Sequence, residues 1–330
     1  MPASRSKGSP MSDIAVIGAG AFGTALAIQA ARAGREVTLW ARHAANAAEI
    51  EQTRLNPRLP GIRLPGGIRV TSHLPANAGA VLLAVPMQSL RGVVERLPPA
   101  DAPLVACAKG VEAGTLRLPL EILAELRPAR AAYVLTGPNF AHEIAEGMPA
   151  AATLAGAGGA ERDRIADLLA TASFRLYGND DAIGAQVGGA AKNVIAIAAG
   201  AVIGAGLGES ARAALITRSL AELSRLTIAL GGRAETVMGL SGLGDLLLTC
   251  TGASSRNFSL GLALGRGEKL ADILAARVAV TEGVATAPAL VARAKGVDMP
   301  ICAAVAALLA GRTTLTRAMG ELLARPRRDE

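Results

Sequence analysis

A glycine-rich turn near the N-terminus is the feature that most constrains the fold of this chain. The apolar run Ile14–Ile17 leads into the segment 18–23 (GAGAFG), and a helix-forming run follows it. In a strand–turn–helix unit, Gly18 permits the tight turn, Gly20 lets a pyrophosphate approach the backbone, and Gly23 lets the helix pack on the strand. The helix N-terminus adds free N–H groups for phosphates. The segment therefore predicts a dinucleotide-binding site, in preference to a glycine-rich turn without a ligand.

The N-terminal half alternates short apolar runs with helix-forming segments, which is typical of a parallel, doubly wound sheet. The expected strands are Ile14–Ile17, Glu36–Trp40, Val81–Val85, Leu104–Ala108, Ala132–Thr136, Ala151–Leu154 and Phe174–Tyr177. After about residue 183, long helical segments rich in Ala, Leu and Ile replace this pattern. We therefore predict a Rossmann-like α/β domain over residues 13–184 and an all-α substrate and catalytic domain over 185–330. A disordered tail over residues 1–12, rich in Ser, Pro, Lys and Arg, precedes them.

Chain length and composition agree with two domains. A chain of 330 residues exceeds the usual size of one domain. Apolar residues make up 51% of the sequence but aromatic residues only 2%, so the core has to close by tight backbone approach. The net charge is +7, yet the sequence has no block of five or more basic residues and few aromatic residues for base stacking. We expect no nucleic-acid partner, because a mildly basic surface also attracts an anionic substrate and cofactor.

The location of the protein in the cell can be inferred from its cysteines, its histidines and its apolar runs. The three cysteines lie far apart and the three histidines lack ligand spacing, which favours a reducing compartment and a protein without a metal. Glycines of the turn interrupt the uncharged run Ile14–Ala31, and the run Asn193–Gly208 is too short to span a bilayer. We therefore expect a cytoplasmic protein with no stable membrane insertion.

The residues after the second expected strand bear on the choice of cofactor. A dinucleotide fold that prefers NAD usually carries an acidic residue at this strand end. Here the strand runs into Ala41, Arg42 and His43, with neither Asp nor Glu at its tip. Arg42 can bind a 2′-phosphate, so we expect NADPH ahead of NADH. The alternative is an ordinary surface arginine.

Two further strand ends carry polar residues where ligands of open α/β sheets bind, beyond the carboxyl ends of the strands. Lys109 follows one strand, and Gly137, Pro138 and Asn139 follow the next. Each alone could be a solvated lysine or a plain turn. Beside a nucleotide-binding pattern, the two together favour a functional site.

Lys192 lies in an apolar segment with no carboxylate within four residues. Burying an unpaired ammonium group is costly, so such a lysine either reaches solvent with its tip or has a function. Burial also lowers the pKa of a lysine, which suits it to proton transfer near neutral pH. Asp245, one helical turn before Thr249, is a candidate long-range partner. Its alternative role is a helix N-cap.

The segment Ser254–Phe258 (SSRNF) has the composition of a phosphate-binding helix start. Ser254 or Ser255 can cap the helix and leave its first N–H groups free, while Arg256 and Asn257 occupy the first turn. Arginine adds paired donors for a phosphate. An ordinary capped helix start has the same pattern, and the segment alone does not decide between the two.

Together these segments make the chain resemble the bacterial type of NAD(P)-dependent glycerol-3-phosphate dehydrogenase, from about Asp13 to Ala310. The matching motifs are GAGAFGTALA from Gly18, AKG around Lys109, TGPNFAHEI at 136–144, KNVIAIAAG at 192–200, GLGDLLLTC at 242–250, SSRNF at 254–258 and VTEGVAT at 280–286. Their joint occurrence in this order is specific. The resemblance implies reversible reduction of dihydroxyacetone phosphate to sn-glycerol 3-phosphate with NADPH or NADH, in support of glycerophospholipid synthesis.

The resemblance also implies residue roles. Lys192 matches the catalytic lysine; we expect Asp245 to hold it and Lys109 to add positive charge near the forming alkoxide. The family positions that bind the substrate correspond here to Lys109, Gly137, Asn139, Lys192, Asp245, Ser255, Arg256 and Asn257. The family positions that contact the dinucleotide correspond here to Gly18, Gly20, Ala21, Phe22, Gly23, Arg42, His43, Lys109, Ala141, Arg256, Val280 and Glu282. Many members carry Ser or Thr in place of Asn139. An amide also donates and accepts, so we expect this substrate contact to persist with altered geometry.

Two rival functions share parts of this pattern. A β-hydroxyacid or ketopantoate-type reductase has the same architecture, but a carboxylate substrate needs neither SSRNF nor Asp245 in this arrangement. A non-catalytic NADPH-sensing module would not need an unpaired Lys192. Related dehydrogenases often pair through their helical domains, so we expect a homodimer. The apolar run Val194–Gly208 fits either the core or the dimer interface.

Overall fold

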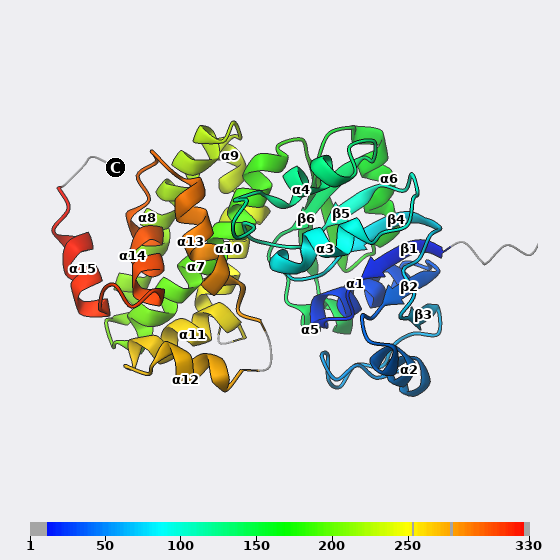
Figure 1. The fold of residues 1–330 in the computed structure, drawn as a ribbon, viewed down its shortest axis with the longest axis horizontal. Helices are drawn as coiled ribbons and strands as arrows, with labels where there is room; N and C mark the ends of the chain where they lie inside the picture. Colours follow the sequence, from blue (N-terminus) through cyan, green and yellow to red (C-terminus); the bar gives the residue numbers. More distant parts are fainter. Residues whose placement is uncertain (1–11, 253, 278–279, 327–330) are drawn as a thin grey trace, which may run out of the picture.

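The computed structural model describes residues 12–252, 254–277 and 280–326 of the chain. They form two adjoining bodies, a sheet covered by helices and a bundle of helices (Figure 1). Between them, the last strand ends at Asn179 and is followed by helix α7 (Ala182–Gly204). The tail expected over residues 1–12 lies outside the described residues, except for Ser12, at which strand β1 begins.

In the described part of the chain, one eight-stranded sheet has the order β3-β2-β1-β4-β5-β6-β7-β8. The strands are β1 (Ser12–Ile17), β2 (Val37–Trp40), β3 (Ile68–Thr71), β4 (Ala78–Leu83), β5 (Leu104–Ala106), β6 (Ala132–Thr136), β7 (Ala150–Ala155) and β8 (Phe174–Asn179). Neighbouring strands run parallel, except β6 and β7, which are antiparallel. The predicted fold class, a Rossmann-like doubly wound sheet followed by a helical body, is confirmed.

Two features of the sheet differ from the prediction. β3 is an additional edge strand, and its four residues alternate between buried and more exposed positions. The direction of β7 is the second feature. Between β6 and β7, the short helix α5 (Ala141–Glu146) lies on α1 (Ala21–Arg32), where Arg32 donates hydrogen bonds to the carbonyl oxygens of Ile144 and Ala145. β7 therefore starts at the sheet edge where β6 ends and runs in the opposite direction.

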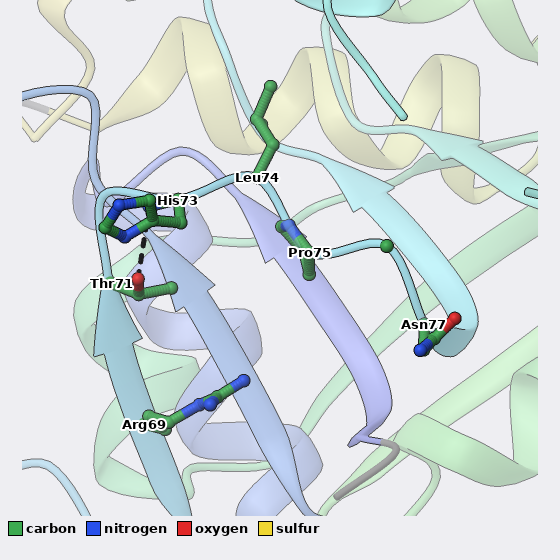
Figure 2. A pocket seen from close by; sticks show the side chains of 7 residues that line it. Arg69, Thr71, His73, Leu74, Pro75 and Asn77 are labelled. Carbon is green, nitrogen blue, oxygen red and sulfur yellow. Dashed lines mark hydrogen bonds between the residues drawn. The ribbon is translucent and has the colours of Figure 1, made fainter. Parts of the chain in front are cut away.

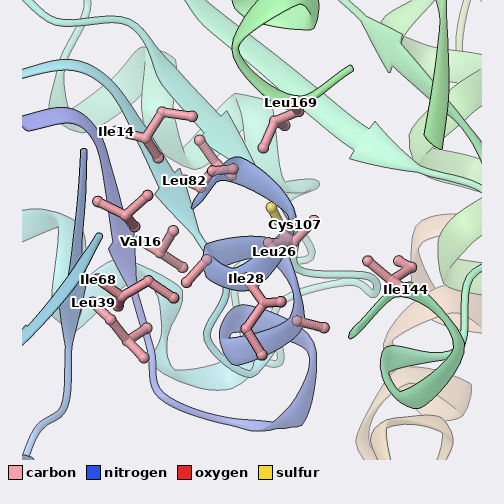
Figure 3. Close-up of a cluster of buried hydrophobic side chains, with 14 of the residues drawn as sticks. Ile14, Val16, Leu26, Ile28, Leu39, Ile68, Leu82, Cys107, Ile144 and Leu169 are labelled. Atoms are coloured by element: carbon pink, nitrogen blue, oxygen red, sulfur yellow. The ribbon is translucent and has the colours of Figure 1, made fainter. Parts of the chain in front are cut away.

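Helices cover both faces of the sheet, and this burial leaves the strand ends as the accessible edge. One face packs on α1, α2, α5 and α6, around side chains such as Ile14, Leu26 and Leu39 (Figure 3). The other face packs on the 3-10 turn η1 and on α3 and α4. These elements are α1 (Ala21–Arg32), α2 (Ala44–Thr53), η1 (Met87–Ser89), α3 (Leu90–Glu95), α4 (Pro119–Leu126) and α6 (Gly159–Leu169).

The second body is built around the long apolar helix α7 (Ala182–Gly204), most of which is buried. The elements that follow it are α8 (Gly208–Ala229), α9 (Ala234–Val237), the π-helical turn η2 (Leu240–Gly244), α10 (Asp245–Thr251), α11 (Arg256–Gly265), α12 (Leu270–Ala275), α13 (Glu282–Arg293), α14 (Pro300–Leu309) and α15 (Leu315–Leu323). A Cβ at Gly200 would lie 2.0 Å from the carbonyl oxygen of Phe258, and one at Gly261 would lie 2.0 Å from that of Ile197. α7 and α11 therefore meet backbone to backbone, as the low aromatic content led us to expect.

Among the described residues, α7 is the one helix long and apolar enough to cross a membrane. The expectation that the apolar run 193–208 is too short for a span was wrong in its measure of length, because the helix begins at Ala182 and has 23 residues. The helix is thus long enough to span a bilayer. Its apolar composition is explained by packing inside the protein, because 89% of the most apolar 18-residue stretch of the helix is buried in the structure.

Candidate active site

The glycine-rich turn joins β1 to α1 and has the shape that a pyrophosphate needs. Gly18 has a φ of 119°, and a Cβ there would lie 2.4 Å from the carbonyl oxygen of Ala84. A Cβ at Gly23 would lie 2.0 Å from the carbonyl oxygen of Gly18. Gly20 instead faces open space, with nothing within 4 Å of its Cβ position. The first turn of α1 has no side-chain cap, so its N–H groups are available to phosphate oxygens. These residues fit a dinucleotide.

Five further residues that are expected to contact the cofactor follow strands β1, β2 and β6 of the sheet. Ala21 and Phe22 are half-buried on the first turn of α1. Arg42 and His43 follow β2 and are exposed, with Arg42 Nε 3.2 Å from His43 Nε2. Ala141 is the first residue of α5, after β6. The structure thus places these residues along one edge of the sheet, the edge that also carries the glycine-rich turn.

Two lysines share one buried carboxylate at the junction of the two bodies. Lys192 Nζ lies 2.5 Å from Oδ1 of Asp245, and Lys109 Nζ lies 2.5 Å from Oδ2 of the same residue. Lys109 also donates to the carbonyl oxygen of Gly137 at 3.1 Å. Asp245 is fully buried, whereas the side chains of Lys109 and Lys192 are 14% and 11% exposed. Within this cluster, Lys109 and Lys192 are therefore the residues whose side chains keep some exposure to solvent.

Three elements bring this cluster together. Lys109 follows β5, Lys192 lies in the middle of α7, and Asp245 begins α10 directly after the π-helical turn. That turn lies on the backbone of α7, since a Cβ at Gly188 would be 2.4 Å from the carbonyl oxygen of Ser241. A larger residue at position 188 would push the turn, and Asp245 with it, away from Lys192.

Burial and charge shift the pKa values of the cluster. Burial lowers the pKa of Lys192 from 10.5 to about 8; attraction to Asp245 opposes this change, and the positive charge of Lys109 adds to it. Burial alone would raise the pKa of Asp245, but the two ammonium groups outweigh it and hold that pKa below its usual value. Asp245 is thus a carboxylate at neutral pH, and Lys192 is an ammonium that loses its proton readily.

Two buried side-chain oxygens near the cluster have no hydrogen-bond partner in the described part of the chain. They are Thr136 Oγ1 and Asn139 Oδ1. Asn139 Nδ2 donates to the carbonyl oxygen of Ala151 at 3.2 Å. A Cβ at Gly189 on α7 would lie 3.1 Å from Thr136 Oγ1 and 3.5 Å from Cγ of Lys109. Buried polar atoms without partners suggest a ligand or water at this place.

The expected phosphate cradle is only partly free. Ser255 caps α11, and its Oγ accepts from the backbone N–H of Phe258 at 3.2 Å. The Asn257 carboxamide is used inside the protein: its Nδ2 donates to Asn193 Oδ1, and its Oδ1 accepts from the N–H of Gly283, each at 2.9 Å. Arg256 is exposed and donates to the carbonyl oxygen of Val280 at 2.8 Å. The groups left for a phosphate are the Arg256 guanidinium and the first N–H groups of α11.

Asn193 is a residue at this site that the sequence did not single out. It follows Lys192 on α7, is 6% exposed, and its Oδ1 is fixed by Asn257. The pair ties the helix of the central lysine to the helix that begins with Arg256. The signal available in the sequence was a second polar residue directly after Lys192 in an otherwise apolar segment.

Glu282 connects the helical body to the sheet. It begins α13, and its carboxylate accepts a hydrogen bond from the backbone N–H of Met87, which follows β4. Burial raises the pKa of Glu282, while this hydrogen bond and the charge of Arg256 oppose the change. Val280, two residues earlier, is exposed. Both residues therefore lie near Arg256.

Two surface hollows lie apart from the lysine cluster. One, of about 280 Å³, is lined by β3 and the loop after it, including Arg69, Thr71 and His73 (Figure 2). The other, of about 330 Å³, lies between α8 and α10 and includes Ile216, Leu243 and Leu247. Neither is lined by a predicted site residue.

Comparisons with known proteins agree over most of the chain. Residues 13–160 match the family model described as NAD-dependent glycerol-3-phosphate dehydrogenase N-terminus, and residues 181–320 match the C-terminus of the same family. Similar proteins include the NAD(P)+ glycerol-3-phosphate dehydrogenases of Acidiphilium cryptum (58% identical, 96% of this chain and 98% of the relative) and Gluconobacter oxydans (54%, covering 95% and 97%).

Solved structures give the same result. The crystal structure of glycerol-3-phosphate dehydrogenase from Coxiella burnetii matches with a TM-score of 0.90 at 36% identity, covering 96% of this chain and 99% of that chain. A ketopantoate reductase from Ralstonia eutropha has a TM-score of 0.59 at 18% identity, covering 91% of this chain and 97% of that chain. The likeness to the reductase shows the fold alone.

Proposed function

Since this chain belongs to the NAD-dependent glycerol-3-phosphate dehydrogenase family, we propose that it reversibly reduces dihydroxyacetone phosphate to sn-glycerol 3-phosphate with NADPH or NADH. The observation that carries the proposal is the buried carboxylate of Asp245 between two lysine ammonium groups. Lys109 of this cluster stands at the same sheet edge as the phosphate-binding turn. A module that only senses NADPH has no need for such a cluster. The product would supply glycerophospholipid synthesis.

The chain's own residues would hold the cofactor at the carboxyl edge of the sheet. The glycine-rich turn and the N-terminus of α1 would bind the pyrophosphate, and Arg42 would bind a 2′-phosphate. NADPH is favoured over NADH because Arg42 is exposed after β2, where NAD-preferring folds carry an acidic residue. When bound, the nicotinamide would supply the hydride that reduces the carbonyl carbon.

Lys192 would act as the acid in the reduction. Its ammonium group polarises the carbonyl oxygen of the substrate and then protonates the alkoxide that forms. In the reverse direction, neutral Lys192 takes the proton from the hydroxyl group. With two ammonium groups and one carboxylate, the cluster carries one net positive charge before proton donation and none after it. That extra charge favours the developing oxyanion, and Lys109 retains its counter-ion throughout.

The phosphate of the substrate would bind at the start of α11. Arg256 supplies charged donors, and the first backbone N–H groups of the helix supply neutral ones. Asn257 would act differently from the expectation, since its carboxamide is already bound to Asn193 and Gly283. We assign it the task of fixing α11 against α7, so that the phosphate site stays at a set distance from Lys192.

We also propose a cytoplasmic homodimer. The three cysteines of the sequence are buried free thiols, which suits a reducing compartment. Residues 194–202 are buried in α7, which supports a core role for this part of the apolar run 194–208. The apolar hollow between α8 and α10, with Leu247 45% exposed, is the surface we favour. Light scattering on purified protein gives the mass that decides between monomer and dimer.

The loss of NADPH absorbance with purified protein tests the function. We expect rapid oxidation with dihydroxyacetone phosphate and a kcat/KM about 100-fold lower with unphosphorylated dihydroxyacetone, because the phosphate positions the ketone. Arg256→Ala should raise KM for dihydroxyacetone phosphate but not KM for unphosphorylated dihydroxyacetone. Arg266→Ala, at the other end of α11, should leave both KM values unchanged. Faster oxidation with ketopantoate would move the assignment to that reductase class. Binding of NADPH without oxidation by any ketone would favour a sensing module.

A further inference from the structure

The segment between α2 and β3 contains a buried amide that reaches the glycine-rich turn. Asn56 is 2% exposed. Its Nδ2 donates to the carbonyl oxygen of Ala19, 37 residues away in the sequence, at 3.0 Å, and to Thr24 Oγ1 at 2.6 Å. Its Oδ1 accepts from the backbone N–H of Arg58 at 3.0 Å. Both ends of the amide are therefore engaged, and one end holds the turn.

The segment that carries Asn56 is itself fixed to the sheet. α2 ends at Thr53 and is capped by Arg54, which has a left-handed φ of 58°. The guanidinium of Arg54 donates to the carbonyl oxygens of Pro65 at 2.5 Å and Ile68 at 2.7 Å, which joins the two ends of the segment. Leu59 is buried in the core between them. An amide on such an anchored segment holds the turn in place instead of following its motion.

The hydrogen bond to Ala19 sets the direction of the peptide group between Ala19 and Gly20. A trans peptide is planar, and its C=O and N–H point in opposite directions. With the carbonyl oxygen of Ala19 turned toward Asn56, the N–H of Gly20 points to the opposite side. No acceptor for this N–H occurs among the residues that the structure describes. The Cβ position of Gly20 is open as well.

We propose that Asn56 is a positioning residue for the cofactor, which orients the Gly20 N–H toward the pyrophosphate by holding the Ala19 carbonyl. The inference rests on the proposed function, which assigns the turn to NADPH. The same hydrogen bond keeps the Ala19 oxygen, which would repel a phosphate, on the far side of the turn. Asn56 thereby contributes to binding without touching the ligand.

Two nearly isosteric substitutions separate this role from a general contribution to folding. Asn56→Asp replaces the donor by an oxygen that faces the Ala19 oxygen. Thr24→Val removes the acceptor of the second hydrogen bond and leaves the bond to Ala19 in place. Both should lower the unfolding temperature. Only Asn56→Asp should raise the Kd for NADPH, by about tenfold, whereas Thr24→Val should keep it within about twofold. Calorimetry without substrate measures this Kd directly.

Steady-state kinetics add a second readout. Asn56→Asp should raise KM for NADPH about tenfold while kcat at saturating NADPH and KM for dihydroxyacetone phosphate stay within about twofold. If Asn56→Asp does not fold, Asn56→Ala removes the donor without adding charge and should show the same rise in Kd. An unchanged Kd in a folded variant, or an equal rise with Thr24→Val, would overturn the proposal. Failure of the proposed function is distinct: the wild-type protein would bind NADPH but not oxidise it with dihydroxyacetone phosphate.

Discussion

The ammonium nitrogen of Lys192 lies 2.5 Å from Oδ1 of Asp245, and both side chains are buried. Lys109 occupies the other oxygen of that carboxylate, so the negative charge is shared between two lysines. Burial lowers the pKa of Lys192 from 10.5 to about 8, against the attraction of Asp245 and with the help of the positive charge of Lys109. The chemistry proposed for this chain depends on that arrangement, and the following predictions address its parts.

Removal of the shared carboxylate should disable the reduction. In Asp245→Asn, two ammonium groups face each other without a counter-ion, and burial favours neutral Lys192. We expect kcat to fall about 100-fold or more at about pH 7, measured at saturating NADPH. Asp167→Asn, an exposed carboxylate on α6, is the matched control and should keep its activity. Wild-type kcat in folded Asp245→Asn would contradict this role.

The pH dependence should follow the pKa of Lys192 and have opposite sign in the two directions. The reduction needs the ammonium form, which is present below the pKa, so kcat/KM for dihydroxyacetone phosphate should fall as the pH rises through about 8. Oxidation of glycerol 3-phosphate needs the neutral amine and should rise over the same range. Because Asp245 raises the pKa of Lys192, Asp245→Asn should move both midpoints to lower pH. Profiles that do not move with this substitution would assign the midpoint to another group.

Two glycines of the turn should respond to alanine in different ways. Gly20 has a φ of −74°, which alanine adopts readily, and nothing lies near its Cβ position. Gly20→Ala should therefore leave the free energy of unfolding within about 0.5 kcal/mol and weaken NADPH binding more than about tenfold. Gly23→Ala should cost about 1–3 kcal/mol of stability, because its Cβ would lie 2.0 Å from the Gly18 oxygen. Denaturant unfolding and calorimetry measure the two effects; tight NADPH binding by Gly20→Ala would exclude the pyrophosphate from this place.

Arg42 should decide between the two nicotinamide cofactors. Its exposed guanidinium can form a charged hydrogen bond with the 2′-phosphate of NADPH. NADH lacks this phosphate, so the same hydrogen bond cannot form with it. Arg42→Ala should raise the Kd for NADPH about tenfold and change that for NADH less than about twofold. Arg312→Ala, an exposed arginine in the helical body, controls for loss of net charge. Equal effects on both cofactors would assign Arg42 to the shared part of the dinucleotide.

The sequence predicted the elements that depend on local pattern and missed those that depend on distant contacts. The strand–turn–helix unit was readable because each glycine has a local role, but β3 was too short and too polar, with Arg69 and Thr71 in four residues. The antiparallel direction of β7 and the packing of α5 on α1 involve contacts between residues more than 100 positions apart in the sequence, which local pattern does not reveal. Lys192 stood out as an unpaired lysine, whereas the sharing of Asp245 with Lys109 is decided by packing between the two bodies.

The central claim is that Lys192 supplies the proton for the reduction, and a single turnover tests it most directly. NADPH-loaded wild-type protein and Lys192→Met are mixed with excess dihydroxyacetone phosphate, and the first-order rate of NADPH oxidation is recorded. We predict a rate about 1,000-fold lower for Lys192→Met, with the Kd for NADPH within about twofold of wild type. An unchanged rate in the variant would show that another group protonates the substrate and would contradict the proposed mechanism.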